Sequence, residues 1–242
     1  MGMNTIKLPD LFHATRLTHL LHEDFDEYVD ADVWTKLAAD PGASAAVSDG
    51  AMGLMTLTTG ATDNNEAAIK STKKNWKFIN NKPLVCEIRL QYAEANTDDA
   101  NVAAGFSSAI GANLLVDDGA GPATTMSGAL IFKVDGGTVW RCISSLSTTQ
   151  TITTSTKTAG GSADQVLRIE CRPVSSTVCE VSYFVDGVPL YDAAVTSRNQ
   201  PIKHNLTYTS AADMHVGAYV KAGSANSEVV NVDYILAAQH RG

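Results

Sequence analysis

The best cluster of carboxylates for acid–base chemistry lies between Glu23 and Asp32. Glycoside hydrolysis needs two carboxyl groups roughly 5 to 9.5 Å apart, and on a strand such a pair comes from alternating positions of one face. Phe25 stands between Glu23 and Glu27, at the position that would complete an alternating set. We therefore expect a solvated lead-in to the first strand, which Phe25 and Tyr28 anchor to the core, and no catalytic pair.

Motifs for a nucleophile or a nucleotide are weak. The run from Gly105 to Ala109 has the spacing of a nucleophile elbow, but no helix follows it, so an ordinary strand of small residues is expected. Gly119-Ala120-Gly121 lacks the third glycine of a dinucleotide-binding turn and is followed by Pro122. We therefore predict that the chain is not an enzyme.

Each set of candidate metal ligands in the sequence also has a simpler structural explanation. His19, His22 and Glu23 have metal-ligand spacing on a helix, but a short terminal segment is a poor rigid scaffold. Three loops offer oxygen ligands of the kind that calcium prefers, and each is equally typical of a turn: Asp63-Asn64-Asn65-Glu66, Asp98-Asp99 and Asp117-Asp118. We predict no cofactor, while loop-bound calcium remains an open alternative.

Tryptophan offers the main signal for carbohydrate binding. Trp34, Trp76 and Trp140 could form a platform on which sugar rings stack. Tryptophan in an alternating strand more often packs in the core, so both interpretations remain open.

The four cysteines are Cys86, Cys142, Cys171 and Cys179, and no two of them form a CxxC pair. This spacing does not indicate zinc or thioredoxin-like chemistry, so we expect buried free thiols. Cys171 and Cys179 are the pair that could face each other across a short connection.

The composition is that of a lightly charged, acidic, globular chain. Its 242 residues include 18 Lys and Arg against 26 Asp and Glu, which gives a formal net charge of −8. Phosphate binding depends on clustered Lys and Arg, so we expect no direct contact with nucleic acid. No apolar run approaches the length of about 18 residues that a membrane span needs, and no secretory signal is evident at the N-terminus.

The first 22 residues differ in pattern from the rest. Their apolar residues are spaced as on one face of an amphipathic helix over residues 10 to 22, namely Leu11, Phe12, Leu17, Leu20 and Leu21. The expected organisation is an N-terminal arm or short helix over residues 1–22, followed by a single β-sandwich domain over residues 23–242.

Beyond Glu23 the apolar residues alternate with polar ones, which is the period of half-buried strands. The predicted strands are PLVCEIRLQY, GALIFKV, TVWRCIS, QVLRIECR, TVCEVSYFV, MHVGAYVKA and VVNVDYILAA. Asp135-Gly136-Gly137 and Asp186-Gly187 supply the positive φ of tight hairpins, so antiparallel pairing follows. The Thr-rich tract of residues 147–161 is expected to form an exposed strand or hairpin. Together these signals predict an all-β, two-sheet antiparallel sandwich or jelly roll.

Several segments between about residues 24 and 239 resemble a group of tailed-bacteriophage virion proteins. They are FDEYVDADVWTKLAAD, GATDNNEAA, EANTDDANVAAGF, FKVDGGTVWRC, RPVSSTVCEVSYFVDGVPLYDA and KAGSANSEVVNVDYILAAQ. The resemblance implies a concanavalin A-like (laminin G-like) jelly roll. It also implies a non-enzymatic capsid decoration or cement protein, located on the exterior of the virion and assembled in the host cytoplasm, with no active-site residues to carry over.

A cement protein acts by burying surface across junctions between capsomers. The expected partners are therefore the major capsid protein and further copies of this chain, as a trimer or a dimer. The apolar residues Leu11, Phe12, Leu17, Leu20 and Leu21 are the candidate docking residues, and the equal alternative is that they cover the sandwich's own open end. The alternative function is a glycan-binding, lectin-like module on a virion.

Overall fold

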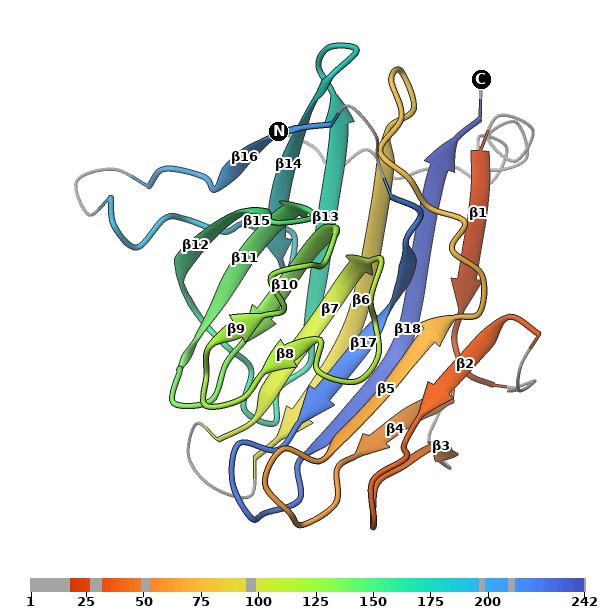
Figure 1. Ribbon diagram of the computed structural model, residues 1–242, viewed down its shortest axis with the longest axis vertical. Coiled ribbons are helices and arrows are strands. Elements are labelled where there is room, and N and C mark those ends of the chain that lie inside the picture. The colour runs from red at the N-terminus through yellow and green to blue at the C-terminus, as the bar shows by residue number, and fades with distance from the viewer. Residues whose placement is uncertain are drawn as a thin grey trace.

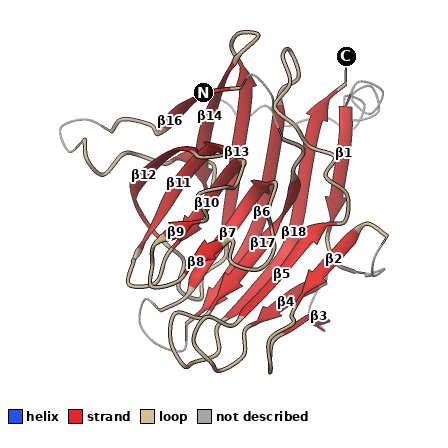
Figure 2. Cartoon of the chain, in the orientation of Figure 1, coloured by secondary structure: helices blue, strands red, loops and turns tan. Residues whose placement is uncertain are grey.

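The structure is a computed structural model that describes residues 18–26, 32–48, 53–94, 99–195, 199–208 and 212–241. Every regular element within these ranges is a β-strand, as Figure 2 shows. The described part of the chain contains no helix long and apolar enough to cross a membrane.

Two large antiparallel sheets pack against each other (Figure 1). Sheet I has nine strands, in which β1 lies beside β18 and β16 lies beside β14. Its main path runs in the order β15 (Val188–Pro189), β14 (Val178–Val185), β13 (Gln165–Pro173), β6 (Leu84–Ala93), β18 (Val229–His240), β4 (Leu54–Thr58) and β3 (Ser44–Ser48); the strands off this path are β1 (Thr18–Glu23) and β16 (Lys203–Thr207).

Sheet II has seven strands, and a separate short hairpin lies in front of it in Figure 1. The order of sheet II is β12 (Thr149–Thr158), β11 (Val139–Leu146), β10 (Gly128–Lys133), β7 (Asn101–Ser107), β17 (His215–Lys221), β5 (Glu66–Ser71) and β2 (Trp34–Leu37); the hairpin pairs β8 (Leu115–Val116) with β9 (Gly121–Pro122). The predicted two-sheet antiparallel sandwich is confirmed, and all of the strand segments predicted from alternation are strands.

Turn chemistry also behaves as predicted. The β14–β15 hairpin turns at Asp186 and Gly187, which have φ values of 54° and 74°, and Gly136 has a φ of 69° between β10 and β11. Such values lie in the left-handed region that these residues enter at low cost. The Thr-rich tract forms β12, an edge strand that is mostly exposed.

The helix predicted for residues 10 to 22 is wrong for its described part. Thr18–Glu23 is strand β1, which pairs with β18 along its whole length. Leu21 packs against the core, whereas Leu20 faces outward and is 39% exposed, so the two side chains do not share one apolar stripe. Ladder hydrogen bonds to a partner from the far end of the chain override the helical spacing. Leu11, Phe12 and Leu17 lie outside the described residues.

The main core fills the space between the two sheets and contains all three tryptophans. Trp34, Trp76 and Trp140 are at most 1% exposed, so the interpretation of these residues as a sugar-stacking platform is wrong. The indole N–H of Trp140 donates to Gln165 Oε1 at 2.7 Å, and that of Trp34 donates to Glu23 Oε2 at 2.7 Å. Such partners stabilise a buried indole, and these two bonds connect strands of different sheets.

The acidic lead-in has a structural role at its first residue. Glu23 accepts the Trp34 indole N–H through one oxygen and the Phe25 backbone N–H through the other, the latter at 3.0 Å. Phe25 is fully buried, as predicted, and Tyr28 lies outside the described residues.

All four cysteines are buried and free, as predicted. Cys171 lies opposite Val181 and Cys179 lies opposite Pro173, so the two thiols are diagonal neighbours in the β13–β14 hairpin. A hydrogen bond with Cys179, together with burial, raises the pKa of the Cys171 thiol well above its usual value. Cys171 therefore behaves as a core residue and not as a reactive thiol.

A polar cluster around His204 connects the two sheets near one edge. Its Nδ1 lies 3.1 Å from the hydroxyl of Tyr183 and 3.1 Å from that of Ser144, and its Nε2 lies 3.0 Å from that of Thr153. Tyr183 belongs to sheet I, whereas Ser144 and Thr153 belong to sheet II. Burial lowers the pKa of His204 from its usual value to about 4, so the imidazole is neutral in the folded protein.

Stability should therefore fall as the pH falls from about 6.5 to about 4. The unfolded chain takes up a proton at His204 near pH 6.5, while the folded chain does so only near pH 4, so acid favours the unfolded state within this window. The expected loss from this residue is about 3 kcal/mol. Urea unfolding at pH 7 and pH 4 measures it, with His204→Gln as the control that cannot titrate. An equal loss in that variant would assign the effect to other groups.

Candidate functional site

The outer face of sheet II, which points away from sheet I, is covered by residues 108–127. We call this segment the strap; it contains the β8–β9 hairpin that lies over the sheet in Figure 1. Leu130 and Phe132 of β10 point toward the strap, while their neighbours Ala129 and Ile131 belong to the main core. A second apolar cluster results, and it comprises Ala68, Ala103, Ile110, Leu114, Leu115, Met126, Leu130, Phe132, Val134, Ile143 and Tyr219.

Side chains of sheet II also hold the strap by its backbone carbonyls. Lys70 Nζ donates to the carbonyl of Ile110 and Ser145 Oγ to that of Met126, both at 2.7 Å. Lys221 Nζ donates to the carbonyl of Leu115 at 3.2 Å. Buried carbonyls need such partners, and these bonds satisfy them although the strap is not a strand of the sheet.

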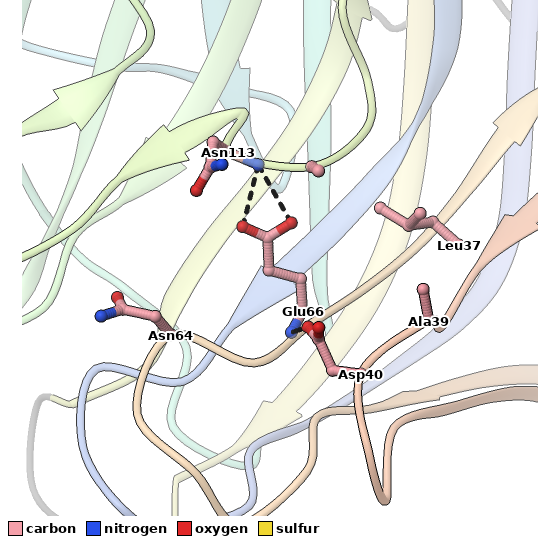
Figure 3. A pocket seen from close by; sticks show the side chains of 7 residues that line it. Leu37, Ala39, Asp40, Asn64, Glu66 and Asn113 are labelled. Atoms are coloured by element: carbon pink, nitrogen blue, oxygen red, sulfur yellow. Dashed lines mark hydrogen bonds between the residues drawn. The ribbon is translucent and has the colours of Figure 1, made fainter.

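A hollow of about 170 Å³ opens at the border between the strap and the end of sheet II (Figure 3). Two polar contacts define it. Glu66 accepts the backbone N–H of Asn113 with both carboxylate oxygens, at 2.8 and 3.0 Å. Asp40 Oδ2 accepts the backbone N–H of Glu66 at 2.7 Å. The lining residues are Leu37, Ala39, Asp40, Asn64, Glu66, Ala112 and Asn113.

Local backbone conformation presents two amide side chains at this hollow. Asn64 and Asn113 have φ values of 67° and 58°, in the left-handed region that asparagine tolerates better than most residues. Each stands in a loop beside a strand end, Asn64 before β5 and Asn113 before β8.

The chemistry available in the hollow is hydrogen bonding. Glu66 is buried, is held by the Asn113 amide and lies 3.4 Å from the ammonium of Lys221. Asp40 already uses one oxygen for the Glu66 amide. The other polar side chains of the lining, Asn64 and Asn113, stand beside apolar residues, and this combination suits a small hydroxyl-rich ligand. The hollow is smaller than the roughly 300 Å³ of ordinary ligand pockets.

The structure does not bring the candidate metal ligands of the sequence together. His19 stacks on Trp76 with ring centroids 4.7 Å apart, while His22 lies on the opposite face of β1. Among the described ranges no group of three or more His, Cys, Asp or Glu side chains has the arrangement of a metal site. In the proposed calcium loops, Glu66 and Asp117 contact Lys221 instead, and Asp98 lies outside the described residues.

The structure also tests the elbow-like run of residues 105–109. Ser107 of the elbow-like run is buried at the end of β7 and accepts the Ala109 backbone N–H at 3.0 Å, as an ordinary strand residue would. The sequence pattern does not predict the strap or the buried pair of Glu66 and Lys221. Tyr219 and Lys221 alternate with other residues in β17 as they would on a solvated face, so the sequence carries only a weak signal of their burial.

The strap should contribute to the stability of the fold. Leu115→Ala removes a fully buried side chain from the cluster under the strap, so we expect a loss of about 3 kcal/mol in the free energy of unfolding. Val116→Ala is the matched control, because this neighbouring side chain is 40% exposed and its truncation should cost less than about 0.5 kcal/mol. Denaturant unfolding of the two variants compares them; equal stabilities would mean that the strap is not packed on the sheet.

Comparison with known proteins identifies the fold. No family model matches the sequence, and no curated protein does. Among solved structures, an endo-1,3-β-glucanase from Streptomyces sioyaensis is similar, with a TM-score of 0.60, 16% identity, and coverage of 93% of this chain and 97% of that one. A protein of unknown function from Shewanella oneidensis MR-1, SO2946, has a TM-score of 0.59, 14% identity, and coverage of 100% and 97%.

Peanut lectin is also similar, with a TM-score of 0.55, 10% identity, and coverage of 92% of this chain and 97% of that one. Lectins and glucanases of this kind share the concanavalin A-like jelly roll, so the predicted fold is confirmed. At these identities the likeness is one of fold alone.

Proposed function

We propose that this protein is a non-catalytic structural component of a tailed-phage virion, which binds the outside of the head and contacts the major capsid protein. The observation that carries the proposal is the covered face of sheet II. The chain's own strap occupies the broad sheet surface on which an extended substrate could lie, and this leaves a rigid closed body. The virion location comes from the sequence resemblance between residues 24 and 239.

A protein of this kind works through buried contact area and not through reacting groups. Leu20 is an exposed apolar residue on the outward face of β1, at the point where the described chain begins. The net charge of −8 accords with an external position and disfavours contact with packaged DNA. Self-association as a trimer or a dimer would multiply weak contacts with the capsid.

Leu20→Asp should weaken binding to virions about tenfold or more without lowering the stability of the protein, because it places a charge in an apolar contact. Ile152→Asp is the matched control: this side chain is exposed to 40%, against 39% for Leu20, but it lies on the edge strand β12 of the other sheet. Co-sedimentation with purified particles measures the binding. Equal binding of both variants would show that Leu20 does not lie in the interface. Absence of the native protein from particles would refute the virion role.

A glycan-binding role is the second candidate, and the hollow beside the strap favours it. Asn64, Asn113 and Asp40 surround a space of about 170 Å³ that also has apolar walls. Carbohydrate sites combine such directional polar groups with apolar surface. The similarity to peanut lectin supports this reading at the level of fold.

Asn64→Gly should reduce glycan binding about tenfold or more, because it removes an amide from the hollow. Glycine retains the left-handed backbone of this position, so the loop is not strained. Asn81→Gly is the matched control, because Asn81 has a φ of 58° and does not line the hollow. Binding of both variants to a glycan array is compared with that of the native protein. Failure of the native protein to bind any glycan would exclude this role.

A further inference from the structure

Lys221 has an unusual position for a lysine. It is the last residue of β17, its side chain is fully buried, and it lies under the strap. Its Nζ contacts Asp117 Oδ1 most closely, and Asn113 Oδ1 lies at 3.3 Å. Glu66 Oε1 lies 3.4 Å away. The nitrogen of a strand residue is thus held against two side chains of the strap and one buried carboxylate.

Strand pairing holds the carboxylate of Glu66 beside this nitrogen. Lys221 and Glu66 are directly opposite each other in the β17–β5 ladder, so both side chains leave the sheet on the strap side. The Asn113 backbone N–H donates to both oxygens of Glu66 and fixes the carboxylate. Glu66 is itself buried, with 6% of its surface exposed.

We propose that Lys221 and Asp117 form an intramolecular isopeptide bond that fastens the strap to sheet II. The Lys221 ammonium transfers one proton to the Asp117 carboxylate that it contacts, and the neutral amine attacks Cγ of the resulting carboxyl group. As the N–Cγ bond forms, Glu66 takes a second proton from the nitrogen and delivers it to the hydroxyl on Cγ, so that the Cγ–O bond breaks and water leaves. One amide and one water are produced from an ammonium and a carboxylate, without an oxidant or another reactant.

Three physical arguments support the reaction. A buried ammonium is costly to desolvate, and conversion to an amide removes both charges. The two groups are held in contact by the fold, which gives the high effective concentration of an intramolecular reaction. Glu66 is a carboxylate in the position of a proton carrier. The inference does not depend on the proposed function, because a covalently fastened strap is compatible with both the structural role and glycan binding.

The intact mass of the denatured full-length protein tests the proposal. We expect a mass below that of the sequence by one water molecule. Proteolysis should then release a branched peptide that joins Lys221 to Asp117, and trypsin should not cleave after Lys221. Glu66→Gln and Lys221→Arg should each restore the full mass expected from their sequences, because the first loses the proton carrier and the second the nucleophile.

The ion pair of Lys157 and Asp186 is an internal control. These groups lie 3.3 Å apart and both side chains are 43% exposed, whereas in the proposed pair Asp117 is 50% exposed but Lys221 is fully buried beside the carboxylate of Glu66. Lys157 and Asp186 should therefore remain unlinked in the same digest. A native protein with its full mass after prolonged incubation would overturn the proposal. Loss of one ammonia with a branch at Asn113 would also overturn the assignment to Asp117. Neither outcome depends on whether a variant folds.

Discussion

Burial of the central strands of sheet II on both faces is the constraint on which the rest of the structure depends. Strands β7, β10 and β17 are buried at every residue, whereas β14 of sheet I alternates buried and half-buried positions. Sheet I covers one face of sheet II, and the strap covers the other. A polar group on the strap side must therefore find its partner within the molecule, because it is withdrawn from water.

Three polar residues of that side meet this requirement by binding the strap. Lys70 and Lys221 donate to its carbonyls, and Glu66 accepts one of its amides. The same groups that would be solvated on an open sheet thus become the attachment of a covering segment. This explains how a loop region with only a two-stranded hairpin of its own is held on the sheet as a third layer.

The covered face also shapes what the fold can do. The concanavalin A-like jelly roll occurs in a glucanase and in a lectin, so the fold alone does not decide between catalysis, binding and structure. In this chain the strap occupies the broad face of sheet II, and the described polar hollow beside it is small. A structural role requires neither an open face nor reacting groups, and a glycan role would be confined to the hollow or another surface.

The sequence by itself determined the local features of the fold. Alternation in segments such as Leu84–Ala93 predicted the strands, and Asp186-Gly187 predicted a hairpin, because the two-residue period and positive φ are properties of neighbouring residues. Only the tertiary structure decided that Thr18–Glu23 is a strand, that the tryptophans are inaccessible and that Lys221 is buried. Those outcomes depend on partners far away in the chain, namely β18, the opposing sheet and the strap, whose positions no local pattern of residues specifies.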